Sequence, residues 1–195
     1  MTDWEQCYLH GQTPWDKSAP SPPLQEWIAL RRPSGRALVP GCGVGHDVAL
    51  LAAAGLDVTG LDVAPSAIAL ARTTYPHLEQ RFVLGDLFAP PAEWEASFDW
   101  VFEHTCLCAL PLTLRTDYER MMMHLLRPGG RLAGVWFIEP EMDPGESGPP
   151  FVLPVPELNA LFPPERWRVL EDVVPTIGYP GRVGRERLRV LEKLP

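Results

Sequence analysis

Short apolar runs alternate with longer segments of helical period through the middle of the chain. Runs of four to eight apolar residues predict buried strands, and apolar residues recurring at three- and four-residue spacing predict helices. We therefore expect strands at residues 37–40, 57–61, 81–84, 98–102 and 131–137. We expect helices at about 45–54, from 65 to at least 72, and at about 112–126. This alternation predicts right-handed βαβ units, and hence an α/β fold with a doubly wound parallel sheet covered on both faces.

The pattern changes after the Pro128-Gly129-Gly130 turn and the strand that follows it. A short helix is expected near 157–162, and two strands near 167–174 and 187–191. A parallel return between these last strands would require a crossover of a dozen or more residues. Because only a loop rich in Pro, Gly and Tyr separates them, we expect them to pair antiparallel. The length of 195 residues with 46% hydrophobic content fits one domain with a full core.

The 23 prolines concentrate at Pro14 to Pro33 and at Pro140 to Pro164. Proline fixes φ and lacks a backbone N–H, so we expect loops or coverings in both stretches. The first of them contains the sequence TPWD, in which Trp15 has no surrounding helical or strand period that would bury it. Either this indole is ordinary core, or it packs against a ligand.

The formal net charge of −8 makes a broad basic face for nucleic acid or anionic lipid unlikely, and favours a small-molecule partner. No run approaches the roughly 20 apolar residues of a membrane span, and residues 1–5 lack the basic start of a secretory signal. We therefore expect a cytoplasmic protein with no membrane partner.

No CxxC pair is present, so we expect reduced thiols and no metal site at the four cysteines, Cys7, Cys42, Cys106 and Cys108.

The stretch LVPGCGVGHD, residues 38–47, follows the first strand and opens a helix. Glycines at Gly41, Gly43 and Gly45 allow the backbone to approach a ligand where a Cβ would collide. A dinucleotide fingerprint would require glycine in place of His46, and the Walker lysine is absent as well, so pyrophosphate binding is weakly supported. The helix N-terminus can instead meet a carboxylate, such as that of a cofactor bearing an amino acid.

Two carboxylates lie at the ends of the next two predicted strands. Asp62 ends the second strand, 21 positions after Gly41, where an acid often binds the hydroxyls of a ribose. Asp86 follows the third strand and could accept a hydrogen bond from an adenine amino group. A helix-capping aspartate and a solvated turn acid are the respective alternatives. Together with the glycine loop, these residues indicate an adenosine site without phosphates.

These motifs resemble the class I S-adenosylmethionine (SAM)-dependent methyltransferases. With WEQCYLHGQTPWD, GLDVAPSAI, GDLF, FDWVFEHTCLCAL, LLRPGG and GPPF, the chain is similar to the thiopurine methyltransferase family, especially its thiol and halide branch. The similarity extends from about Trp4 to about Leu191. It implies a Rossmann-like, mostly parallel seven-stranded sheet with an antiparallel last strand. It also implies one domain, 1–195, in which residues 1–34 form a lid over the cofactor SAM, whose product is S-adenosylhomocysteine (SAH).

The resemblance also implies a set of site residues. An indole face can stabilise the permanent positive charge of a sulfonium, so Trp4 and Trp15 are expected at the cofactor. The cofactor-binding residues are then Trp4, Trp15, Gly41, Gly43, Gly45, Asp62, Asp86, Leu87 and Glu103. The acceptor side would include His104, Arg115 and Phe137. Two of these positions depart from the thiol and halide branch, which often has aromatic residues where this chain has Glu103 to Leu107, and which tends to have tyrosine at position 137.

His104, at the end of the fourth strand, is the candidate catalytic residue, because it could take a proton or orient the acceptor. A histidine that is merely hydrogen-bonded at a strand end is the alternative. Arg115 could attract an anionic acceptor or be a solvated helix arginine. Asp16 could hold the N-terminal leader, residues 1–34, in place or touch the substrate. A thiol is already partly ionised at neutral pH, so a weak base, or none, suffices.

The function most consistent with the sequence is methyl transfer to a small thiol or another soft sulfur or halide nucleophile. An O- or N-methyltransferase of a small metabolite is one alternative, and a cofactor-binding module without turnover is another. A nicotinamide oxidoreductase is disfavoured by His46 in the glycine loop. We expect a monomer whose partner is the small-molecule acceptor.

Overall fold

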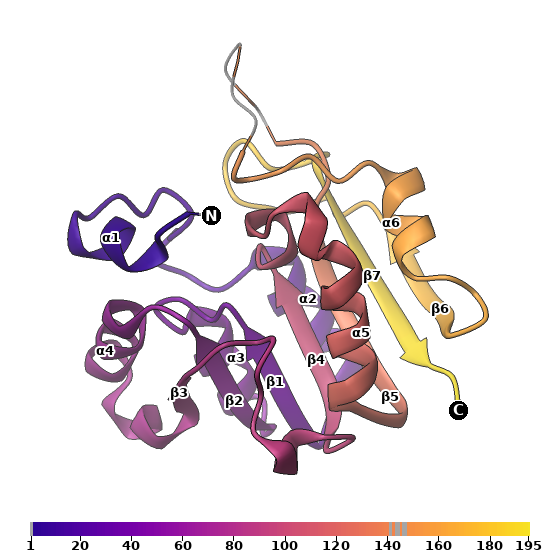
Figure 1. Cartoon of the computed structure of the whole chain (residues 1–195), viewed down its shortest axis with the longest axis horizontal. Coiled ribbons are helices and arrows are strands. Elements are labelled where there is room, and N and C mark those ends of the chain that lie inside the picture. The colour runs from indigo at the N-terminus through magenta and orange to yellow at the C-terminus, as the bar shows by residue number, and fades with distance from the viewer. Residues whose placement is uncertain (1, 141, 143–144, 146–147) are drawn as a thin grey trace.

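The computed structural model describes residues 2–140, 142, 145 and 148–195. Met1 of the expected lid and part of the expected loop after Pro140 lie outside these residues. The described residues form one seven-stranded sheet of order β3-β2-β1-β4-β5-β7-β6 (Figure 1). Its strands are β1 (Arg36–Pro40), β2 (Asp57–Asp62), β3 (Phe82–Leu84), β4 (Phe98–His104), β5 (Leu126–Phe137), β6 (Trp167–Val173) and β7 (Glu186–Lys193).

The α-helices of the described residues are α1 (Trp4–Leu9), α2 (Pro22–Arg31), α3 (His46–Ala53), α4 (Pro65–Thr74), α5 (Arg115–Leu125) and α6 (Val155–Leu161). Short 3-10 helices are η1 (Pro76–Arg81), η2 (Ala92–Trp94), η3 (Leu107–Ala109) and η4 (Leu112–Leu114). In the part of the chain that the structure describes, no helix has the length and apolar character needed to cross a bilayer.

Strand directions confirm the predicted topology. The strands β1 to β5 pair in parallel, and β7 runs antiparallel to both β5 and β6. Because β1 lies between β2 and β4, the strand order reverses there, and a crevice forms at the carboxyl ends of β1 and β4. Figure 1 shows α1 at this end of the sheet, near α4 and apart from both helix layers.

Helices cover both faces of the sheet, as predicted. Helices α2, α3 and α4 pack on one face and α5 and α6 on the other. Side chains alternate along β4 accordingly. Trp100 and Phe102 point into the core under α2, α3 and α4, while Val101 points into the core under α5 and α6. The two apolar cores hold the strands in a rigid frame, so the positions of the strand ends are fixed.

Two local predictions were wrong. The stretch from Pro14 to Pro33, where only loop or covering was expected, contains helix α2. Helix α2 begins at Pro22, and proline is accepted in a first turn because the N–H groups there have no partner within the helix. The segment Pro128 to Gly130 is part of β5, where the pairing with β4 shifts register between Phe98 and Trp100, rather than a turn before the strand.

Candidate active site

The glycine loop joins β1 to α3 at the crevice. Gly41, Gly43 and Gly45 have φ values of 60°, 52° and 88°, in the left-handed region that favours glycine. A Cβ at Gly45 would lie 2.4 Å from Cε1 of Phe82, and one at Gly43 would lie 3.0 Å from the Tyr8 hydroxyl oxygen. Gly45 therefore permits the close packing of α3 on the sheet, while Gly43 permits the leader to approach the loop.

Asp62 is brought against this loop, as predicted from the spacing. Its Oδ2 accepts a hydrogen bond of 2.8 Å from the Gly43 N–H, and its Oδ1 accepts one of 3.0 Å from the Ala64 N–H. Burial raises the pKa of this carboxyl, although backbone N–H groups act in the opposite direction. Each carboxylate oxygen has two lone pairs, so Asp62 can still accept hydrogen bonds from ligand hydroxyls.

The leader lies directly over the glycine loop. Glu5 of α1 accepts hydrogen bonds from Ser66 at the start of α4, 2.9 Å from its N–H and 2.6 Å from its hydroxyl. The indole of Trp15 packs edge-to-face against Trp4 and Tyr8, with ring centroids 5.3 and 5.8 Å apart. Its Nε1 donates to the Tyr8 hydroxyl at 3.2 Å. These contacts make the leader an aromatic cover fastened to the strand ends.

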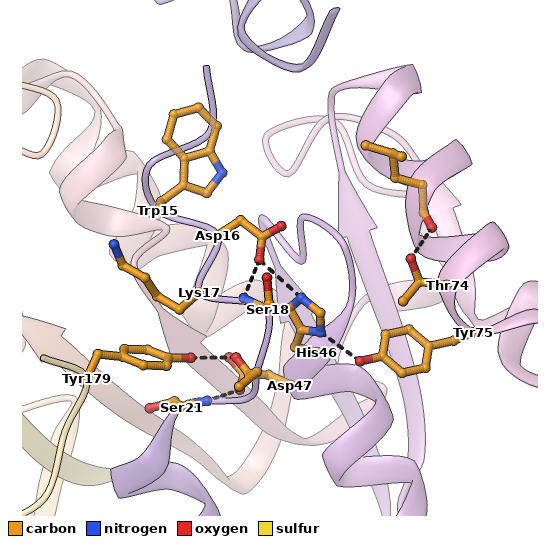
Figure 2. Close-up of polar contacts among 12 residues, drawn as sticks. Trp15, Asp16, Lys17, Ser18, Ser21, His46, Asp47, Thr74, Tyr75 and Tyr179 are labelled. Atoms are coloured by element: carbon orange, nitrogen blue, oxygen red, sulfur yellow. Dashed lines mark hydrogen bonds and ion pairs between the residues drawn. The ribbon is translucent and has the colours of Figure 1, made fainter. Parts of the chain in front are cut away.

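A histidine in the glycine loop fastens the leader at a second point. His46 Nε2 lies 3.1 Å from Asp16 Oδ1, and its Nδ1 lies 2.7 Å from the Tyr75 hydroxyl (Figure 2). His46 therefore occupies the position of the missing dinucleotide glycine and instead contacts the leader. Of the two roles considered for Asp16, holding the leader is the one that its hydrogen bonds support.

The neighbouring carboxylate, Asp47, joins the leader to the end of β4. Its Oδ1 accepts from the Ser21 N–H at 2.8 Å (Figure 2), and its Oδ2 lies 2.8 Å from His104 Nδ1. Burial alone would raise the pKa of Asp47, but the charge and hydrogen bond of His104 and the Ser21 N–H together lower it. The imidazole of His104 stacks on Tyr179 at 5.9 Å. Its Nε2 is buried and has no hydrogen-bond partner among the described residues.

These groups surround a cavity of about 60 Å³. The cavity is lined by the leader, the glycine loop, the end of β4 and Tyr179, and Trp15, Gly43 and His104 all face it. Sites for small molecules usually have volumes of about 300 to 1,000 Å³. This cavity is therefore smaller than the space that a bound nucleoside needs.

A larger hollow of about 380 Å³ lies at the opposite end of the strands, where β1, β4 and β5 begin. Two of its arginines are already paired with carboxylates: Arg31 with Glu171 at 2.9 Å, and Arg127 with Asp99 at 2.6 Å. Ligands of open α/β sheets bind at the carboxyl ends of the strands. The chemistry is therefore assigned to the smaller cavity beside the glycine loop.

The family model for thiopurine S-methyltransferase matches residues 1–176 of this chain. The chain belongs to the thiopurine S-methyltransferase family. It is a SAM-dependent methyltransferase, which confirms the predicted enzyme class and cofactor.

Known members of this family resemble the chain over nearly its full length. A thiocyanate methyltransferase 1 of Arabidopsis thaliana is 33% identical over 198 residues, covering 98% of this chain and 84% of the relative. A probable thiol methyltransferase 2 of the same plant is 31% identical over 188 residues, covering 95% and 82%. Among solved structures, a 1,6-didemethyltoxoflavin-N1-methyltransferase of Burkholderia thailandensis with bound SAH has a TM-score of 0.74 at 22% identity, covering 99% and 86%. This last similarity confirms the class I methyltransferase fold.

Six of the residues predicted at the cofactor do not line the cavity: Trp4, Gly45, Asp62, Asp86, Leu87 and Glu103. Asp86 is exposed at the end of β3, and its Oδ1 accepts from the Phe88 N–H at 2.8 Å. Leu87 beside it is buried. Trp4 reaches the cavity through its contact with Trp15.

Glu103 is 1% exposed and is held entirely by protein groups. Its carboxylate accepts from the N–H groups of Cys106 and Leu107 at 2.9 and 3.1 Å, and from the Tyr118 hydroxyl at 2.6 Å. Burial raises the pKa of this carboxyl against those three hydrogen bonds. Glu103 thus holds together the turn that follows His104.

Arg115, predicted on the acceptor side, does not line the cavity. It is 4% exposed, so the solvated alternative was wrong. Its guanidinium forms an ion pair with Glu157 and donates to the Val152 carbonyl at 2.8 Å. It therefore ties α5 to the segment around α6.

Phe137 does not line the cavity either, but two further side chains connect it to His104. The Arg182 guanidinium lies 4.4 Å from the centre of the Phe137 ring and 5.6 Å from that of Tyr179, which in turn stacks on His104. No sequence motif points to Tyr179 or Arg182, because both lie in the loop before β7. Asp47 could have been found, because it belongs to the glycine-loop motif.

Proposed function

We propose that the enzyme transfers the methyl group of SAM to a small thiol or to another soft sulfur or halide nucleophile. The observation that carries this proposal is the similarity to thiocyanate and thiol methyltransferases over 98% and 95% of the chain. The aromatic leader supports it, because the cavity of about 60 Å³ that it leaves beside the glycine loop suits a small acceptor.

SAM supplies a methyl group on a cationic sulfur, and we propose that the strand ends hold it. The residues fit such a cofactor: Gly41 and Gly43 leave room that a Cβ would fill, and Asp62 has acceptor capacity for the ribose hydroxyls. Asp86 and Leu87 would contact the adenine. Gly45 would act through the position of α3, and Glu103 through the turn after β4.

We further propose that residues 1–34 form the lid of this single domain. Trp15 faces the cavity and Trp4 packs against its edge, so the two indoles can cover the sulfonium. Methyl transfer is an in-line displacement, and alignment of two bound reactants can supply about 7 to 11 kcal/mol. The lid and the strand ends would provide this alignment.

On the acceptor side we propose His104 as the catalytic residue, because it alone among the acceptor-side predictions lines the cavity. Phe137 would support the acceptor site through Arg182 and Tyr179. Arg115 would contribute only by fixing the Val152 segment.

The test is incubation with methyl-labelled SAM and a panel of thiols, hydrosulfide, iodide, thiocyanate and a thiopurine. We expect labelled methyl product from at least one sulfur nucleophile at a rate above that of any alcohol or amine. Faster transfer to hydroxyl or amine acceptors would favour an O- or N-methyltransferase. Tight SAM binding with no transfer to any acceptor would contradict the proposal.

A further inference from the structure

We propose that Asp47 is a positioning residue that makes His104 a general base, so that the enzyme deprotonates its acceptor and is suited to thiols and hydrogen sulfide. This inference rests on the proposed function and narrows its substrate class. Iodide and thiocyanate anions carry no proton, so they gain nothing from such a base.

The hydrogen bonds of Asp47 determine where the imidazole proton lies. A carboxylate only accepts, so the 2.8 Å contact between Asp47 Oδ2 and His104 Nδ1 requires the proton on Nδ1. Oδ1 is occupied by the Ser21 N–H, which holds the carboxylate in one orientation. Nε2 is therefore left with a free lone pair. The lowered pKa of Asp47 is consistent with an ionised carboxylate here.

The free nitrogen lacks a donor from the protein. His104 lines the cavity, and its Nε2 is buried without a hydrogen-bond partner among the described residues. A buried acceptor left unpaired costs about 1 to 3 kcal/mol. A protic ligand in the cavity would supply the missing donor, whereas a bare anion would not.

The proposed step balances without any further reactant. The S–H bond of the acceptor breaks, and its proton moves to His104 Nε2. The electron pair left on the acceptor sulfur forms the new bond to the methyl carbon. The bond between that carbon and the cationic sulfur breaks, and its electron pair remains on the leaving sulfur as SAH forms. The imidazolium then releases its proton to water.

The surroundings of His104 suit a transient positive charge. The titratable and charged groups that act on the ring are Asp47 of α3, Glu103 of β4, Glu186 of β7 and the Tyr179 ring, with Arg182 behind it. Glu186 pairs with Arg182 at 3.2 Å, so its charge is partly compensated. Asp47 is the carboxylate that contacts the ring directly and can stabilise the imidazolium.

Asp47→Asn tests this arrangement with little change of shape. The Ser21 N–H still needs an acceptor, so the amide oxygen takes the Oδ1 position and the NH₂ group takes the Oδ2 position. The NH₂ group then donates to His104 Nδ1, which moves the imidazole proton to Nε2. His104 is then still present, but its Nε2 already carries a proton and cannot take one from the acceptor.

The first measurement is the ring ¹⁵N spectrum of the histidines, with His104 assigned by its absence in His104→Gln. We expect the proton on Nδ1 in the wild type and on Nε2 in Asp47→Asn. The second is the pH dependence of kcat/KM. The variant would use only thiolate already present, so for a thiol of pKa about 8.5 it should be about 30-fold slower at pH 7 and nearly equal to the wild type at pH 9.5.

Iodide is the comparison acceptor, for which the ratio of wild type to variant should not change with pH. His104→Gln should show the same thiol profile as Asp47→Asn. Asp117→Asn, on the exposed surface of α5, is the matched control and should leave both the spectrum and the profile unchanged.

An unchanged His104 tautomer in Asp47→Asn, or a loss that is equal for thiol and iodide at every pH, would overturn the inference. The failure of the proposed function is a different result: the wild type would then methylate no sulfur nucleophile at any pH. The tautomer measurement would still decide whether Asp47 orients His104.

Discussion

Replacing Trp15 separates two contributions of the leader, the packing of the lid and the stabilisation of a sulfonium. In the closed leader the indole makes two edge-to-face contacts, each worth about 0.5 to 1.5 kcal/mol. Its hydrogen bond to the Tyr8 hydroxyl adds about 0.5 to 1.5 kcal/mol. Trp15→Ala removes all three, so leader closure should weaken by about 1.5 to 4.5 kcal/mol.

The packing loss should affect SAM and SAH alike, because the proposed lid would close over both. A cation–π contribution of about 0.5 to 2 kcal/mol applies only to SAM, since SAH is a neutral thioether. Trp15→Ala should therefore weaken SAM binding about 2- to 30-fold more than SAH binding. Trp15→Phe keeps an aromatic face and should show a smaller difference.

Calorimetric titration of each variant with SAM and with SAH measures both effects. Leu9→Ala is the matched control, because Leu9 lies in the same leader and is 61% exposed. Equal losses for SAM and SAH would refute the sulfonium contact. Unchanged affinity for both would refute closure of the leader over the cofactor.

Three further predictions concern stability, each measured by urea unfolding. Gly45→Ala places a Cβ 2.4 Å from a ring carbon of Phe82 at φ +88° and should cost about 1 to 3 kcal/mol, whereas Gly55→Ala, with φ +93° but open space around it, should cost less. Glu103→Ala leaves three buried donors without an acceptor and should cost about 3 kcal/mol or more. Glu103→Gln keeps acceptors for the backbone donors and should match the wild type at pH 8, because the raised pKa means that the buried charge is destabilising above it. Since the pKa of Asp47 is lowered, its contribution is present above about pH 4 and is lost as the pH falls through its folded value, so the wild type should lose more stability than Asp47→Asn on acidification.

The sheet was predictable because its strands are buried on both faces and therefore read as continuous apolar runs. The leader helices were not. Helix α1 has only six residues and buries none of them, so it carries no clear apolar period. Helix α2 starts at Pro22 and Pro23, and a proline-rich stretch is typical of loops even though proline is also accepted in the first turn of a helix. Pro128 likewise indicated a turn, although a strand can accept proline at a bulge.

Local spacing located the residues that lie at strand ends close to the glycine loop. Asp62 is an example, because parallel neighbours such as β1 and β2 place their carboxyl ends side by side. Pairs that are distant in sequence could not be found in this way. Asp47 and His104 are 57 positions apart, and their contact depends on β4 pairing with β1. Tyr179 reaches the same site from the loop before β7, which has no motif of its own.

The contacts of His104 link the acceptor site to the position of the leader. Asp47, which orients the ring, also binds the Ser21 N–H, and Tyr179, which stacks on the ring, donates its hydroxyl to the Ala19 carbonyl at 2.6 Å. If the leader is the lid that we propose, its outward movement to admit SAM would break both contacts. The proposed acceptor site would then be complete only after the leader has closed again over the cofactor. It follows that the acceptor should bind after SAM, and equal acceptor affinity with and without SAH would contradict this order.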